Sequence, residues 1–175
     1  GGMGVATMPS WHPAGTGVSM PQDPVAAFAQ QLGIQPSEEA ELGCFAEDCL
    51  RSALPPSWSS HADKATGLFY YIDDQRQASS WEHPMLAHFQ RVLEMARRYL
   101  AGPTETFWEE LKGHMWHQHK QQLECWHGPF SDAQGRQYFV NSVEGLSSWQ
   151  DPRYETQHVF DVESRLLDRL AEVLP

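Results

Sequence analysis

Positive charge is scarce in this sequence. Its 175 residues include 12 Lys and Arg against 23 Asp and Glu, which gives a formal net charge of −11 at pH 7. No basic residue precedes Arg51, and no later cluster is longer than the pair Arg97-Arg98. Nucleic-acid phosphates and anionic membrane surfaces attract clustered Lys and Arg, so we expect neither as a partner. A basic protein segment is the complementary expectation.

Cysteine is also rare, and long apolar runs are missing. The three cysteines, Cys44, Cys49 and Cys125, are odd in number and follow no redox or metal spacing. This usage predicts reduced thiols in a cytoplasmic protein. No apolar run is long enough to predict a membrane span, and no basic stretch followed by an apolar one predicts a secretory signal.

Catalytic and metal-binding patterns are missing as well. The sequence has no Gly-rich phosphate loop, no H-E-x-x-H and no nucleophile elbow, so we expect no enzymatic activity and no cofactor. Four histidines lie close to Cys125, but they include no compact set of four ligands at zinc spacing. We therefore expect a solvent-facing group without bound metal, made of His114, His117, His119 and His127.

Aromatic residues, in contrast, are plentiful and repeat with a fixed period. Trp58 is followed by Trp81 and then Pro84, and Trp126 is followed by Trp149 and Pro152 at the same spacing. Shifting the sequence so that Trp58 falls on Trp126 superposes the two stretches, and a match of this density indicates an internal repeat. The superposed pairs include Trp58 with Trp126, Gly67 with Gly135, Tyr70 with Tyr138, Tyr71 with Phe139, Ile72 with Val140, Asp73 with Asn141, Trp81 with Trp149, and Pro84 with Pro152.

The organisation of the chain follows from the positions of the two repeats. The first residues are rich in Gly, Pro, Ser and Thr, which predicts a flexible tail, and Gly1-Gly2 before Met3 looks like a cloning remnant. The rest divides into two modules with one repeat each. The expected ranges are 1–21 for the tail, 22–102 for the first module with its repeat at 54–84, and 103–175 for the second with its repeat at 123–152.

Helical patterns surround both repeats. Asp23-Pro24 predicts a helix start, and Gly33 predicts the end of that helix. Ser37 and Thr104 are expected to cap two further helices. Between the repeats and after the second one, apolar residues recur on one face at helical spacing. The repeats themselves are β-rich, with turn residues between the predicted strands.

Two tryptophans around a tyrosine–aromatic pair, closing with W-x-x-P, resemble the WW domain family. The resemblance implies an α+β fold with two small three-stranded antiparallel sheets, each packed with flanking α-helices, and a role in binding without catalysis. A unit of about 30 residues buries little surface, so the helices are expected to complete its core. The hydrophobic buckle of the family maps to Trp58, Tyr71 and Pro84, and to Trp126, Phe139 and Pro152.

The same resemblance implies a ligand groove on each sheet. Two parallel rings, from a Tyr and the second Trp, would hold a proline of an extended peptide, and a serine hydroxyl would bind a ligand carbonyl. Alternatively, the second Trp of a repeat only packs, with the chain's own helices as its partner. The implied ligand-binding residues are Tyr70, Ile72, Asp74, Ser79 and Trp81 in the first repeat, and Tyr138, Val140, Ser147 and Trp149 in the second.

Ligand preference depends on where the repeats depart from the family. Asp74 and Ser142 stand where the family has the His that recognises the tyrosine of a P-P-x-Y ligand, so this resemblance does not imply P-P-x-Y specificity. Asp73 replaces the usual structural Asn, which the second repeat keeps as Asn141. The two acidic residues beside the first groove favour Lys or Arg in the ligand.

Segment 24–93 shows a narrower resemblance, to the amino-terminal module of a centrosomal protein family of the centriolar distal appendages. It implies a scaffold in the cytoplasm and cytoskeleton, at the centriole or at the basal body of a cilium or flagellum. There it would dock a proline-containing, basic segment of a tau-tubulin-type kinase. The residues that carry it are Phe28-Ala29, Leu32-Gly33-Ile34, Leu54-Pro55-Pro56, Trp58, Tyr70-Tyr71 and Trp81-x-His83-Pro84.

Two other functions stay open at this point. The chain could be a WW-containing regulatory fragment of a larger enzyme, such as a ubiquitin ligase, whose catalytic domain lies outside these residues. It could also be a tandem-WW splicing adaptor. Two helical patterns separate Pro84 from Trp126, whereas that family joins its WW units by a short linker, so the adaptor is disfavoured. The oligomeric state does not follow from the sequence.

Overall fold

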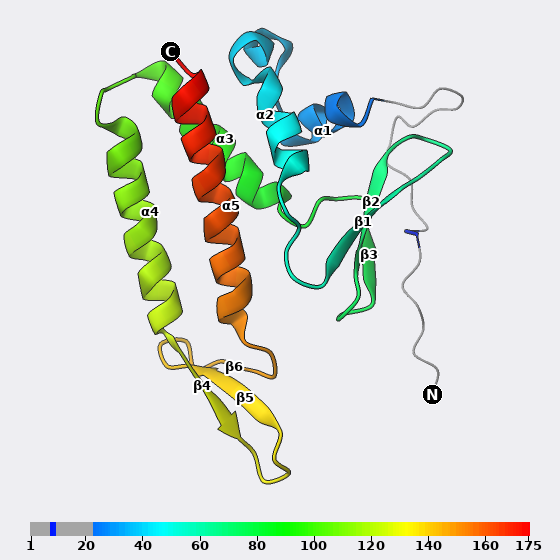
Figure 1. Ribbon diagram of the computed structural model, residues 1–175, viewed down its shortest axis with the longest axis vertical. Helices are drawn as coiled ribbons and strands as arrows, with labels where there is room; N and C mark the ends of the chain where they lie inside the picture. Colours follow the sequence, from blue (N-terminus) through cyan, green and yellow to red (C-terminus); the bar gives the residue numbers. More distant parts are fainter. Residues whose placement is uncertain (1–7, 10–22) are drawn as a thin grey trace.

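The computed structural model describes residues 8–9 and 23–175, so most of the predicted tail at 1–21 lies outside the described residues. Within them, five α-helices and two three-stranded antiparallel sheets form the predicted α+β fold (Figure 1). In chain order the elements are α1 (Pro24–Leu32), a short 3-10 helix (Pro36–Glu38), α2 (Glu39–Arg51), β1 (Trp58–Ala62), β2 (Phe69–Asp73), β3 (Ala78–Ser80), α3 (Leu86–Ala101), α4 (Phe107–Glu124), β4 (Trp126–Ser131), β5 (Gln137–Asn141), β6 (Ser147–Ser148) and α5 (Pro152–Val173).

The first helix begins and ends where the sequence predicts. The Asp23 carboxylate accepts the Val25 N–H at 3.0 Å, and Pro24 occupies the first helical position. Both features stabilise a helix start, since the first N–H groups have no partner within the helix. Gly33 ends the helix at φ 87°, and its N–H binds the Ala29 carbonyl. This left-handed conformation suits glycine, which has no Cβ to clash.

The two other predicted caps are wrong. Ser37 lies inside the 3-10 turn, and α2 starts only at Glu39. The turn is held by Glu38, whose carboxylate accepts the Gln35 N–H and two bonds from Arg97, at 2.7 and 2.9 Å. Thr104 binds the Phe107 N–H through its carbonyl rather than its side chain, and Thr106 takes the cap position before α4.

One apolar core joins the helices. Its buried side chains come from α1, α2, α3 and α5, with Met115 added from α4. The predicted module boundary at residue 102 stays a prediction, but the core contains residues from both sides of it. The fully or almost fully buried members include Phe28, Leu32, Leu42, Phe45, Phe89, Val92, Leu93, Leu166, Leu167 and Leu170.

The first sheet is attached to this core through His83. The imidazole lies between Phe28 of α1, Tyr71 of β2 and Phe89 of α3, with ring centres 5.6, 4.8 and 4.9 Å away. Its Nδ1 accepts the Met85 N–H at 3.0 Å, so the ring is neutral at that nitrogen. Burial lowers the pKa of His83 to about 4. The neutral ring therefore packs like an apolar side chain between sheet and helices.

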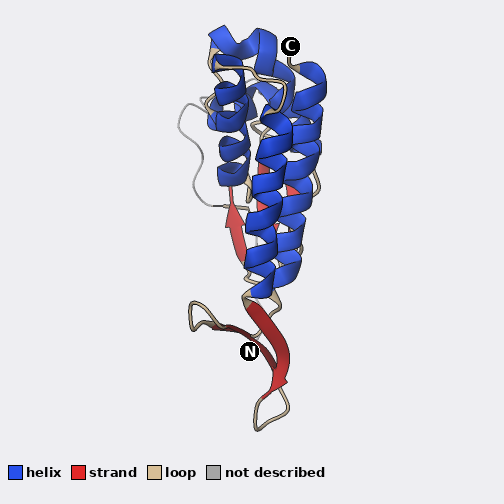
Figure 2. Cartoon of the chain, turned by 90° about the vertical axis from the view of Figure 1, so that its left-hand side faces the viewer, coloured by secondary structure: helices blue, strands red, loops and turns tan. Residues whose placement is uncertain are grey.

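The second sheet is held differently, at the ends of α4 and α5 (Figure 2). β4 follows α4 after one residue, and α5 starts at Pro152 with Asp151 as its cap. Arg153 donates to the Gly128 carbonyl at 3.2 Å and lies over the Phe139 ring at 5.7 Å. These contacts fix one end of the sheet, and Phe139 and Asn141 are the two buried residues of its strands.

The histidine group between α4 and β4 departs from expectation in one member. His119 is buried rather than solvent-facing, because its ring stacks on Phe160 at 4.1 Å and its Nε2 lies 3.0 Å from the Gln157 Oε1. Within residues 8–9 and 23–175, no cluster of His, Cys, Asp and Glu is arranged to hold a metal ion. In the same residues, no helix is both long and apolar enough to cross a membrane.

Candidate functional site

The first sheet brings four of its five predicted ligand-binding residues onto one face. The pairing sets Ser59 opposite Ile72 and Ile72 opposite Ser79, so these three form a row across the strands. Tyr70 lies two residues before Ile72 and therefore points to the same side. Trp81 follows β3 directly, and its ring centre is 5.7 Å from that of Tyr70.

The aromatic geometry of this groove differs from the predicted parallel slot. The Tyr70 and Trp81 rings meet edge to face at 67°. His61 stacks on the other side of Tyr70, at 5.3 Å and 22°, and its Nε2 is 2.9 Å from the Ser59 hydroxyl. His61 was not among the predicted groove residues, although its position opposite Tyr70 in the β1–β2 pairing is the signal that could have found it.

The acidic pair of the first repeat splits into two roles. Asp73 is fully buried, where it accepts bonds from Ser57 Oγ at 2.7 Å and Arg76 at 2.8 Å. Burial alone would raise the pKa of Asp73, but these hydrogen bonds outweigh it and lower the pKa. The prediction that Asp73 attracts a basic ligand is therefore wrong. Asp74 is exposed in the β2–β3 turn, at the opposite end of β2 from Tyr70.

Asn141 performs the corresponding task in the second sheet. Its side-chain oxygen accepts the N–H groups of Val143 and Glu144, each at 3.0 Å, as Asp73 accepts those of Gln75 and Arg76. Both residues therefore fix the turn that follows the central strand. Asp73 thus supplies the same oxygen acceptor as Asn141, and its charge adds an ion pair with Arg76.

The second sheet presents an open version of the same arrangement. Val140 pairs with Ser147, and Tyr138 lies on the same face. The rings of Tyr138 and Trp149 lie 6.3 Å apart at 77°, and Phe130 adds a third ring 5.7 Å from Tyr138. Trp149 is 61% exposed and Phe130 is 44% exposed. Phe130 is a second groove residue that the sequence analysis missed.

A charged pair borders this second groove. The Arg136 guanidinium lies 4.7 Å from the centre of the Trp149 ring, within the range of a cation–π contact. Asp132 accepts from the Arg136 Nε at 2.8 Å, which turns the guanidinium toward the tryptophan face. The pair leaves Trp149 largely exposed and gives the groove one polar wall.

The first sheet is three-stranded and antiparallel, carries a tyrosine and a tryptophan on one face, and packs against helices. These features define a WW-type protein-interaction module. The first sheet lies within residues 16–106, which match the model of the CEP164 N-terminal domain. The chain belongs to this family.

Three curated relatives match parts of the chain. The chain is 30% identical over 76 residues to the mouse centrosomal protein of 164 kDa, which is 43% of this chain and 5% of that protein. It is 26% identical to the Drosophila melanogaster transcriptional coactivator yorkie over 67% of the chain and 30% of that protein. It is 25% identical to the rat Rho GTPase-activating protein 27 over 70% of the chain and 12% of that protein. The chain thus spans a minor part of each.

Proposed function

We propose that this chain is a non-catalytic scaffold whose aromatic grooves bind a proline-containing, basic segment of a partner protein. The open groove of the second sheet carries the proposal. Trp149 is 61% exposed beside Tyr138 and Phe130, and among the described residues outside this groove only Trp116 and Tyr154 have exposed large aromatic side chains. A cluster of exposed aromatic rings on a small sheet is costly in water unless a ligand uses it.

Proline fits this groove because of its shape and its stiffness. Aromatic rings that meet at steep angles leave a notch between them, and a pyrrolidine ring fills such a notch without polar groups to desolvate. A polyproline-type segment is already extended, so it loses little chain entropy on binding. The expected affinity is in the micromolar range, as the contact area of a single short peptide is small.

The charge of the molecule supports basic residues around that proline. With 23 acidic against 12 basic side chains, the chain attracts a cationic segment over a Debye length and repels an acidic one. Asp74 at the first sheet and Glu144 at the second are exposed acidic residues in equivalent turns. Each follows its central strand at the end away from the groove tyrosine, so both are positioned to pair with a Lys or Arg a few residues away from the bound proline.

The cellular setting is proposed from the family. The similarity to a protein named as centrosomal supports a place at the centrosome, and more narrowly at the basal body of a cilium or flagellum. In that setting, a tau-tubulin-type kinase would supply the proline-containing segment. Loss of centrosomal localisation of a kinase of this class, when the tagged chain carries Trp149→Ala, would support this part of the proposal; unchanged recruitment would contradict it.

A second candidate is a regulatory segment of a larger enzyme. One relative over 70% of the chain is named as a GTPase-activating protein, which favours this reading over the splicing adaptor. The peptide-binding role is the same in both cases. A catalytic domain elsewhere in the full-length protein would establish the second candidate.

Peptide titration tests the proposed function. A short fluorescent peptide with prolines flanked by lysines should bind the wild-type chain, and Trp149→Ala should weaken binding at least about tenfold, or about 1.4 kcal/mol. Trp116→Ala is the matched control, because Trp116 is similarly exposed (55%) but lies on α4. Equal loss in both variants, or none in either, would contradict the assignment of the groove.

A further inference from the structure

Equivalent residues in the two grooves differ in burial. Trp81 is 6% exposed whereas Trp149 is 61% exposed, and Ile72 is buried whereas Val140 is half-buried. The central and third strands pair alike on both sheets, with Ile72 opposite Ser79 and Val140 opposite Ser147, and the register shift between His127 and Phe130 lies in the β4–β5 pair. The pairing at Ile72 and Val140 therefore does not explain their difference in burial. Residues outside the first sheet must therefore cover the groove face of this sheet.

Helix α1 covers one edge of the groove face of the first sheet. A small cavity of about 20 Å³ is lined by Trp81 and Tyr71 together with Pro24, Ala27 and Phe28. The start of α1 therefore borders the same cavity as Trp81. Ile72 does not line this cavity, so α1 leaves the middle of the groove face unexplained.

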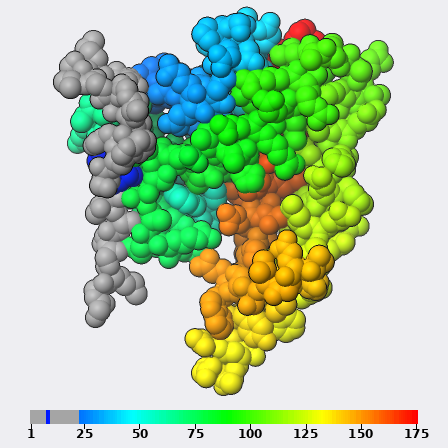
Figure 3. All heavy atoms as spheres, turned by 180° about the vertical axis from the view of Figure 1, so that it is seen from behind, coloured from blue at the N-terminus to red at the C-terminus, as the bar shows by residue number. Residues whose placement is uncertain are grey.

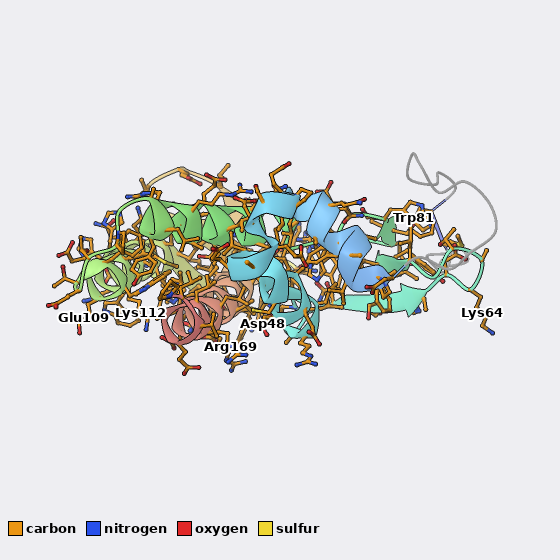
Figure 4. The ribbon with its side chains drawn as sticks, turned by 90° about the horizontal axis from the view of Figure 1, so that it is seen from above. Asp48, Lys64, Trp81, Glu109, Lys112 and Arg169 are labelled. Carbon is orange, nitrogen blue, oxygen red and sulfur yellow. The ribbon has the colours of Figure 1, made fainter. Side chains whose placement is uncertain are left out.

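Residues 8–9 pass beside the first sheet and are available for the remaining cover. Met8 and Pro9 are both half-buried, although they are distant in sequence from the described helices and strands. The dark blue trace of this pair passes beside the first sheet in Figure 1, and its atoms lie next to green atoms of the first repeat in the space-filling view of Figure 3. Figure 4 shows the same trace close to the labelled Trp81.

The chemistry of this pair suits the groove. A residue before proline is restricted to extended backbone, and proline itself favours the polyproline conformation. Met8 adds a flexible apolar side chain that adapts to an aromatic surface. The Met8-Pro9 pair thus has the ring, and favours the conformation, that the Tyr70/Trp81 groove is expected to bind.

We infer that Met8-Pro9 is an internal ligand of the first groove, which a partner must displace before it can bind there. The inference rests on the proposed function of that groove. Because the pair belongs to the same chain, its effective concentration is about millimolar, and an internal Kd about tenfold below this concentration weakens a partner's apparent affinity about tenfold. The first groove is regulated by Met8-Pro9, while the second is constitutively open.

Occupancy is tested first, without any partner. In the full chain, the indole N–H resonance of Trp81, assigned by its loss in Trp81→Phe, should shift in Pro9→Ala. It should stay in place in Pro103→Ala, a matched change at an exposed proline between α3 and α4. An unshifted Trp81 resonance in Pro9→Ala, or equal shifts in both variants, would overturn the inference.

Competition is tested in the Trp149→Ala background, where only the first groove can report. Adding Pro9→Ala should strengthen binding of the lysine-flanked proline peptide at least about tenfold. If the Trp81 resonance moves but the freed groove binds no peptide, the internal contact stands and the proposed function of the first groove fails. If the peptide binds equally with and without Pro9→Ala, the competition is overturned.

Discussion

At the scale of single residues, three ionisable groups have pKa values shifted by their surroundings: His83 and Asp73 at the first sheet, and Glu38 before α2. His83 is kept neutral among three aromatic rings, and the Asp73 carboxylate is surrounded by donors. Glu38 is held by Arg97, whose hydrogen bonds lower the pKa of that carboxyl to about 2. Each group sets a pH range in which the fold is stable, since a pKa that differs between folded and unfolded states couples protonation to folding.

His83 gives the first prediction. Its pKa is about 4 in the fold against 6.5 when unperturbed, so the unfolded chain binds more protons between these values and stability falls as pH drops from 6.5 to 4. The loss should reach up to about 3 kcal/mol. Urea unfolding of wild type and His83→Gln at pH 7 and pH 4.5 measures it.

The variant should lose less of its stability on acidification than wild type does. Glu38 and Asp73 contribute in the same direction, but at lower pH, because stability from a carboxyl with a lowered pKa is lost below its unfolded value near 4. The same pH dependence in both proteins would contradict the neutral role of His83.

At the scale of elements, α1 and α3 each contribute one aromatic side chain, Phe28 and Phe89, to the contact with His83 beside the first sheet. Phe89 of α3 is fully buried against His83 and Phe28, which meets it edge to face at 6.0 Å. A small sheet with so little core of its own depends on such contacts. The second sheet has fewer of them and is held mainly through Arg153.

Phe89→Ala tests this dependence. Truncating a fully buried phenylalanine should lower the free energy of unfolding by about 3–5 kcal/mol. Phe130→Ala, at a 44% exposed position on the second sheet, should cost less than about 1 kcal/mol. Chemical denaturation of both variants compares them. Similar losses would mean that α3 does not support the first sheet in the way described.

Local patterns predicted the elements well. The internal repeat placed the strands of both sheets, and Asp23, Pro24 and Gly33 fixed α1, because caps and turns act over a few neighbouring residues. The features that were predicted wrongly depend on residues that are distant in the sequence. Arg97, 59 residues away, holds Glu38 and so moves the start of α2. The cover over Trp81 comes from outside its repeat, and no period within the sequence encodes that difference.

At the scale of the whole molecule, one helical core serves both sheets. Leu166, Leu167 and Leu170 of α5 are buried in the same cluster as α2 and α3. Ion pairs join the same helices: Arg169 of α5 lies 3.5 Å from Asp48 of α2, and Lys112 of α4 pairs with Asp168 of α5. Figure 4 shows Asp48 and Arg169 close together. Exposed pairs of this kind contribute little, so the apolar contacts dominate.

Shortening the chain tests how far the halves depend on each other. A chain that ends at residue 106 keeps the first sheet and α1–α3 but loses the α5 leucines, which exposes the core that they cover. Its melting temperature should fall by more than about 10 °C, as several kcal/mol of burial is lost. An unchanged melting temperature would establish 22–102 as an independent module, as the sequence analysis divides it.

The central claim is that the second groove is the open proline-binding site. Its most direct test is a titration of the labelled chain with the lysine-flanked proline peptide, followed through the indole N–H resonances of its tryptophans. The account predicts progressive shifts for Trp149, with Trp81 shifting only in Pro9→Ala and Trp116 in neither protein. A saturable shift at Trp116 without one at Trp149 would contradict it and move the binding surface to the helices.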